Sequence, residues 1–163
     1  GTRARDAYLV KNGVLTGRLH SAATAAALDE AVTGNARAIS FEFEPIVRMT
    51  STWIAGGTDT FESLLRGAEG GLYIPDFFHG SGMSTFTIAP ARAYRIRGGK
   101  PAEPVLVSVI SGNVMQTLHQ IDGATAETEL RSLFTGGCGK MEQWPLRVAF
   151  GGPYLRVRGL KVQ

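Results

Sequence analysis

The sequence predicts an α+β fold of mainly antiparallel strands, arranged as a barrel-like or sandwich-like sheet of hairpins with two or three short helices. Short runs of alternating apolar and polar residues indicate the strands. Glycine is abundant, at 21 of 163 residues, which is typical of tight turns. Hydrophobic residues make up 44% of the chain, enough for one core, so we expect a single domain over residues 1–163.

Three segments carry the pattern of β-hairpins. Residues 8–17 contain two short apolar runs joined by Asn-Gly, a pair that tolerates the positive φ angles of a type I′ turn. Residues 93–110 contain a similar unit with Gly-Gly at the turn, and residues 153–162 form the third. In this last segment Arg156 and Arg158 alternate with apolar residues, so we expect both to face solvent.

Three further segments carry helix signals. Residues 21–32 are rich in alanine and are followed by Thr-Gly, a helix stop. Residues 58–67 begin with capping residues and end at glycine. In residues 113–121 apolar side chains recur at i, i+4 and i+7, so this helix should bury one face.

Charge and hydropathy exclude some classes of function. The net charge is +3, but Lys and Arg are scattered along the chain, so nucleic-acid binding is not indicated. No apolar stretch approaches the roughly 18 to 20 residues that span a bilayer, and a signal-peptide core is absent from the N-terminus. We therefore expect a cytoplasmic protein without a membrane segment.

Cys138 is the single cysteine, in a glycine-rich bend over residues 135–140, so the chain cannot form an internal disulfide. Lys140 and exposed backbone N–H groups in such a bend would favour the thiolate, the form that attacks electrophiles or binds metal. Local sequence leaves three interpretations open: a metal ligand, a nucleophile and an incidental packed thiol.

The three histidines, His20, His79 and His119, lie far apart in the sequence. A zinc site needs three or four ligands, and this spacing does not indicate that the fold gathers them with Cys138. His79 stands out because aromatic residues precede it and glycines follow it. It could form a nucleophilic pair with Cys138, or it could have a structural or surface role.

Residues 48–52 form a polar cluster between apolar flanks. As one strand, this segment would place Arg48, Thr50 and Thr52 on the same face. A face with one cation and two hydroxyls could bind a peptide backbone or a carboxylate; it could equally be an ordinary wet face of a sheet.

Eight short segments, in order along nearly the whole chain, resemble the C-terminal domain of the TldD/PmbA family, metallopeptidases once described as modulators of DNA gyrase. The segments are Gly1-Thr2 with the turn at residues 12–13, and then residues 33–37, 45–53, 71–74, 93–94, 111–113, 138–140 and 152–157. The Cys-Gly-Lys motif at residues 138–140 resembles the catalytic, TldD-like members. The resemblance implies that Cys138 is a zinc ligand, together with two histidines of a helical His-Glu-x-x-x-His motif.

That histidine motif is absent from this chain and precedes this domain in the family, so the resemblance implies a missing N-terminal domain. Alone, the chain should neither bind zinc tightly nor hydrolyse peptides. The resemblance implies extended or unfolded polypeptide as substrate and a homodimer, or a heterodimer with a PmbA/TldE-like paralogue. The residues expected beside the metal or in the substrate cleft are Lys140, Gln143, Arg48, Thr50, Thr52, Arg37 and His79. A non-catalytic interaction module that docks with a partner subunit, or binds as a gyrase modulator would, is the alternative.

Overall fold

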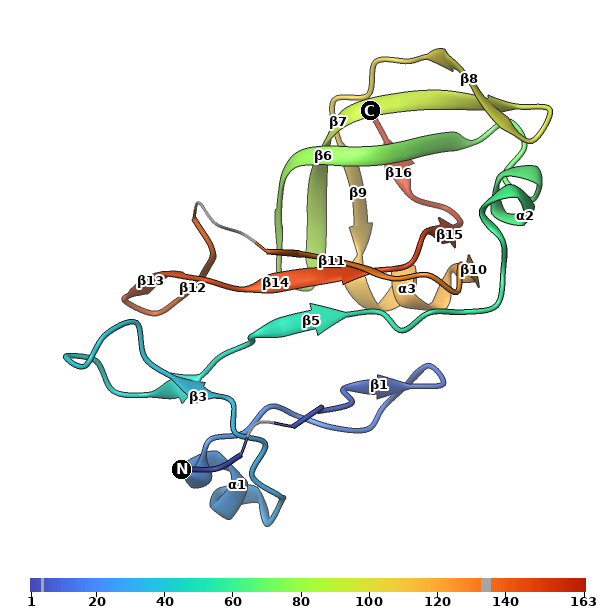
Figure 1. Ribbon diagram of the computed structural model, residues 1–163. Helices are drawn as coiled ribbons and strands as arrows, with labels where there is room; N and C mark the ends of the chain where they lie inside the picture. Colours follow the sequence, from blue (N-terminus) through green and yellow to red (C-terminus); the bar gives the residue numbers. More distant parts are fainter. Residues whose placement is uncertain (4, 133–135) are drawn as a thin grey trace. The chain divides into compact units, whose positions relative to one another are not determined.

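The computed structural model describes residues 1–3, 5–132 and 136–163, and the fold is α+β with mainly antiparallel strands, as predicted (Figure 1). It divides into two compact units: residues 1–54 with 129–151, and residues 55–128 with 152–163. Each unit has its own strands and helices. None of the helices in the described ranges has the length and hydrophobicity that a membrane crossing requires.

The first unit consists of short strands and the helix α1. Its elements are β1 (Val10–Lys11), β2 (Val14–Leu15), α1 (Ala22–Leu28), β3 (Ala36–Arg37), β4 (Ile46–Val47), β5 (Ser51–Trp53), β11 (Glu129–Ser132), β12 (Cys138–Lys140), β13 (Gln143–Leu146) and β14 (Ala149–Gly152), which ends at the unit boundary. Antiparallel pairs join β1 to β2, β3 to β4 and β12 to β13. A further sheet has the order β11-β14-β5, with β5 parallel to β14. Within the described residues β5 is therefore an edge strand.

Helix α1 begins at a capping box and is shorter than predicted. The hydroxyl of the N-cap Ser21 accepts a hydrogen bond from the backbone N–H of Thr24, and the Thr24 hydroxyl accepts one from the N–H of Ser21. The helix ends before Asp29, which adopts the left-handed conformation with φ +52°. The predicted extension to residue 32 is wrong because this conformation stops the helix.

His20 is a buried residue that joins two parts of this helical segment. Its side chain is almost inaccessible, and its ring nitrogens contact the Thr24 hydroxyl at 3.1 Å and a carboxylate oxygen of Glu30 at 2.8 Å. The hydrogen bond from His20 lowers the pKa of Glu30. The imidazole thus ties the first turn of α1 to the chain that follows the helix.

The second unit is organised around a larger antiparallel sheet. Its elements are α2 (Phe61–Arg66), β6 (Leu72–Gly82), β7 (Thr85–Arg97), β8 (Lys100–Pro104), β9 (Ile110–Asn113), α3 (Val114–His119), β10 (Ile121–Ala124), β15 (Leu155–Val157) and β16 (Lys161–Val162). The sheet has the order β16-β9-β7-β6, and β8 also pairs with β7. The long strands β6 and β7 lie side by side (Figure 1). A core of Ala93, Val107 and Ile110 packs against this sheet's apolar side chains.

The two helices of this unit lie within the predicted segments. Thr60 caps α2 by accepting a hydrogen bond from Ser63 N–H, and Asn113 caps α3 in the same way through Gln116 N–H. Helix α3 has no fully buried side chain. Its predicted buried face is thus only half-buried.

Two of the three predicted hairpins are confirmed by their turns. Asn12 and Gly13 have φ of +51° and +76°, and Gly98 and Gly99 have φ of +59° and +68°. In the second turn the Glu69 carboxylate accepts hydrogen bonds from both glycine N–H groups at 3.0 Å.

The third predicted hairpin, over residues 153–162, is wrong. Strand β15 pairs with β10, whereas β16 pairs with β9. An ionic contact favours the pairing of β15 with β10: the Asp122 carboxylate on β10 accepts hydrogen bonds from Arg156 at 2.7 Å and from Arg158 at 2.8 Å. The Arg156 side chain is only 19% exposed, so its predicted solvent-facing position is wrong, whereas the Arg158 side chain is 54% exposed, as predicted.

Candidate functional site around Cys138

Cys138 is the first residue of β12, which pairs with β13 in a tight hairpin of the first unit. Gly137 precedes it with φ +138°, and a Cβ atom there would lie 2.3 Å from the carbonyl oxygen of Leu146. Only glycine therefore fits at residue 137. At the turn Met141 adopts φ +55°. Thr135, which belongs to the predicted glycine-rich bend, lies outside the described residues.

The thiol of Cys138 is half-buried and free. Its one described polar contact is a long one, 3.9 Å from Sγ to the carbonyl oxygen of Gly139. A thiol with so weak a contact could coordinate a metal without first breaking a strong protein interaction. Among the described residues no group of three or more His, Cys, Asp or Glu side chains could hold a metal ion. Cys138 thus fits as one ligand and cannot complete a zinc site with the described residues.

Arg48 is the buried cation of this site, at 2% exposure. Its guanidinium donates to the carbonyl oxygen of Cys138 at 2.8 Å and to that of Gln143 at 3.1 Å. One side chain therefore bridges β12 and β13. The single strand predicted over residues 48–52 is wrong, because β4 ends at Val47 and Arg48 turns inward to reach these acceptors.

Lys140 and Gln143 connect the same hairpin to the segment that contains β4. The Lys140 ammonium donates to the carbonyl oxygen of Val47 at 2.9 Å. The Gln143 side chain is buried; its Oε1 accepts from Ile39 N–H at 3.0 Å and its Nε2 donates to the Glu44 carbonyl oxygen at 2.8 Å. Both side chains therefore bind protein backbone.

Arg37, Thr50 and Thr52 differ in exposure. Arg37 is half-buried and donates to the carbonyl oxygens of Met49 at 2.9 Å and Arg147 at 3.1 Å. Thr50 and Thr52 are exposed at the edge strand β5 and next to it. Of the residues expected in the substrate cleft in this unit, the two threonines are the most accessible.

His79 belongs to the second unit. It lies exposed on β6, paired in register with Ala89 of β7. The nucleophilic pair of His79 with Cys138 stays a prediction.

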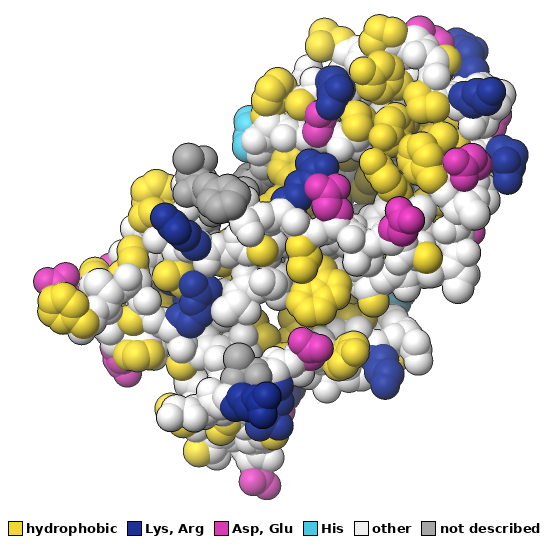
Figure 2. Space-filling model, viewed as in Figure 1, with side chains coloured by type: hydrophobic (Ala, Val, Ile, Leu, Met, Phe, Trp, Pro, Cys, Tyr) yellow, Lys and Arg dark blue, Asp and Glu magenta, His cyan; other side chains and the backbone are white. Residues whose placement is uncertain are grey.

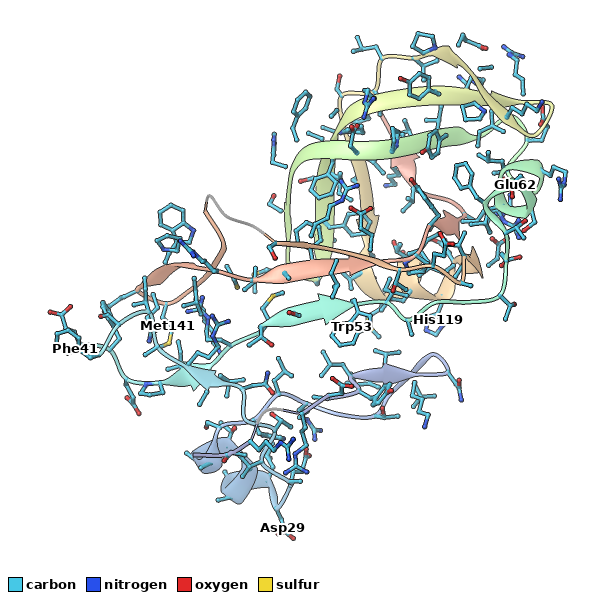
Figure 3. All side chains as sticks on the ribbon, viewed as in Figure 1. Asp29, Phe41, Trp53, Glu62, His119 and Met141 are labelled. Carbon is cyan, nitrogen blue, oxygen red and sulfur yellow. The ribbon has the colours of Figure 1, made fainter. Side chains whose placement is uncertain are left out.

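Several large apolar side chains of the first unit are exposed, which was not expected from the sequence. Phe41 is 98% exposed, Met141 83% and Trp144 62%. Figure 3 shows Phe41 and Met141 toward the same end of this unit as β12 and β13. In the sequence, these three residues could be noticed only as large apolar residues within polar or turn segments.

Basic side chains form no single stripe on the face seen in Figure 2. Several are paired with acids, including Arg92 with Asp76 and Arg97 with Glu103. A phosphate-binding surface normally concentrates its cations, so this distribution agrees with the scattered charge of the sequence.

Comparison with known proteins decides the family. The family described as the PmbA/TldA metallopeptidase C-terminal domain matches residues 1–163. This chain belongs to that family. The resemblance to the TldD/PmbA family is thereby confirmed.

Several metalloproteases are similar to this PmbA/TldA domain. One from Synechocystis sp. is 42% identical over 163 residues, which cover 99% of this chain and 35% of the relative. One from Methanothermobacter thermautotrophicus is 38% identical, with coverages of 99% and 35%. A zinc metalloprotease TldD homolog from Saccharolobus solfataricus is 31% identical, with coverages of 99% and 36%. The chain thus spans about a third of the length of these relatives.

Solved structures share the fold of this domain. TldE from Thermococcus kodakarensis matches with a TM-score of 0.77 and 18% identity, covering 99% of this chain and 34% of that one. A Thermotoga maritima protein, described as a candidate modulator of a DNA gyrase, matches with a TM-score of 0.70 and 21% identity, with the same coverages.

Proposed function

We propose that this domain supplies a cysteine ligand, Cys138, to the zinc of a TldD-like metallopeptidase, and that the other ligands come from sequence outside this chain. The observation that carries the proposal is the free, half-buried thiol on a hairpin braced by a buried arginine. The metalloprotease names of the relatives support the metal, and one of them names zinc. Thiolate is among the ligands that zinc prefers.

A zinc ion held by Cys138 and two ligands from outside this chain would keep a coordination position for water, and it would supply Lewis-acid chemistry for peptide hydrolysis. The role of this chain in such a site is to hold the Cys138 thiolate in place. Arg48, Lys140 and Gln143 support that task, since all three bind the backbone of the Cys138 hairpin or of the segment beside it.

The proposed substrate is an extended or unfolded polypeptide. Strand β5 supports this class of substrate because it lies at a sheet edge within the described residues and all three of its residues are exposed. An extended peptide can add to such an edge through backbone hydrogen bonds. Thr50 and Thr52 would offer hydroxyl groups to it.

Zinc quantification on the full-length protein and its Cys138→Ser variant tests the proposal. Loss of the thiolate removes one of three ligands, so we expect the variant to lose most of its bound zinc. The matched control is Ser51→Ala, which removes a hydroxyl from β5 and leaves Cys138 intact; it should retain zinc. Equal zinc content in the Cys138→Ser and wild-type proteins would contradict the ligand role.

A second candidate function is a non-catalytic interaction module. The exposure of Phe41, Met141 and Trp144 favours it, because such apolar groups are typical of surfaces that dock with another protein. We propose a homodimer or a TldE-like paralogue as the partner. The parent reading frame distinguishes the two functions: a His-Glu-x-x-x-His motif before this domain supports the peptidase, and its absence supports the module.

A further inference from the structure

We infer that Arg48 is a positioning residue for Cys138: its buried guanidinium fixes the backbone that carries the thiol. The inference rests on the proposed zinc role of Cys138 and adds a residue to it. It also changes the role expected for Arg48 from substrate binding to support of a ligand.

The surroundings of Arg48 indicate this role. The side chain is 2% exposed and forms no ion pair within the described part of the chain. Its Nη atoms both donate to backbone carbonyls, while its Nε is buried without a described hydrogen-bond partner. A buried charge is costly unless its hydrogen bonds are well placed. The carbonyl oxygens of β12 and β13 are the acceptors that compensate this cost.

Two consecutive residues, Val47 and Arg48, hold β12 on both sides of Gly139. Arg48 donates to the carbonyl oxygen of Cys138, and the carbonyl oxygen of Val47 accepts from the side chain of Lys140. Glycines flank Cys138 on both sides, and glycine gives the backbone wide freedom. Without these anchors the segment would visit many conformations in which the thiol points away from a metal.

Preorganisation explains why the anchor matters for binding. A ligand that is already ordered loses little conformational entropy when the metal binds, and groups that orient ligands tune metal affinity strongly. Arg48 reaches across 90 residues of sequence to supply that order. Lysine cannot replace it fully, because a single ammonium lacks the fork that spans two carbonyls.

The test measures zinc affinity of the full-length protein by competition with a chromophoric chelator. Arg48→Met should weaken zinc binding by about 10- to 100-fold, and Arg48→Lys should fall between Arg48→Met and wild type. The matched control is Arg156→Met, which also removes a mostly buried arginine with two hydrogen bonds, one of them to a backbone carbonyl, but none to Cys138. It should stay within about twofold of wild type.

A second readout needs no zinc. In the metal-free protein, iodoacetamide alkylation of Cys138, followed by mass spectrometry of the peptide that carries it, reports how freely this strand moves. Arg48→Met should raise the alkylation rate at least about threefold, and Arg156→Met should not.

The outcomes separate the inference from the proposed function. If Cys138→Ser keeps wild-type zinc affinity, the proposed function fails and the zinc role of Arg48 fails with it. If Cys138→Ser loses zinc while Arg48→Met matches Arg156→Met in affinity and alkylation rate, only the inference is overturned. If Arg48→Met does not fold, Arg48→Lys decides: wild-type affinity and alkylation in that variant overturn the inference.

Discussion

The strand that carries Cys138 owes its conformation to single residues, one without a side chain and one with a buried charge. Gly137 lets the backbone pass close to Leu146, and Arg48 joins the two strands of the hairpin. The sequence revealed the glycines and the cysteine but not the position of Arg48. Its acceptors lie 90 and 95 residues away, so no local pattern could predict them.

Gly137→Ala should destabilise the chain. The new Cβ would meet the Leu146 carbonyl oxygen at 2.3 Å in a backbone conformation with φ +138°. We expect the free energy of unfolding in urea to fall by about 2 kcal/mol or more. Gly136→Ala is the control, since its Cβ would meet nothing within 4 Å and only φ +83° is unfavourable. A loss of about 1 kcal/mol is expected there, and equal losses would contradict the clash.

Glu30 should make stability depend on pH. Its pKa is lowered from an ordinary value of 4.5, first by the hydrogen bond from His20. A lowered folded-state pKa contributes stability above the unfolded value, which is lost as pH falls through the lowered one. Glu30→Gln lacks this contribution, so its urea midpoint should fall less than that of wild type between neutral pH and about pH 3. Parallel pH profiles would show that Glu30 does not contribute.

Elements begin where the sequence places capping residues, and they pair where distant side chains direct them. Ser21, Thr60 and Asn113 cap the three described helices, and Thr60 belongs to the capping residues predicted at the start of the segment 58–67. Strand partners are different: β15 was expected to pair with β16 but pairs with β10, where Asp122 binds Arg156 of β15 and Arg158, which follows that strand. A capping residue forms its hydrogen bond within one helical turn, whereas a strand can pair with any of several strands that lie far away in the sequence.

Thr60→Ala should weaken α2. The Thr60 hydroxyl accepts a hydrogen bond from the backbone N–H of Ser63 at 3.1 Å. An N–H group in the first turn of a helix has no acceptor within the helix, so the cap supplies one. We expect a loss of about 1 kcal/mol in the free energy of unfolding, measured with urea. Thr58→Ala, an exposed threonine before the cap, should cost less than about 0.5 kcal/mol. The cap assignment would be wrong if the two variants were equally stable.

At the scale of the whole molecule, this chain and its parent should differ in zinc affinity. The described residues offer one thiol and no cluster of three ligands. Isothermal titration calorimetry should therefore show zinc binding to residues 1–163 that is weaker by several orders of magnitude than binding to the full-length protein. Similar affinities would mean that the chain completes a metal site by itself, contrary to the proposed function.

The fold class, the family, the capped start of α2 and two of the hairpin turns could be predicted from the amino-acid sequence alone. These features depend on short-range rules, such as the positive φ of Asn12-Gly13, or on ordered motifs along the chain. The folded chain was needed to reveal that Arg48 faces inward, that Gln143 binds the backbone near β4, and that β5 runs parallel to β14 at a sheet edge. Each of these depends on hydrogen bonds between segments far apart in sequence, which only the folded chain brings together.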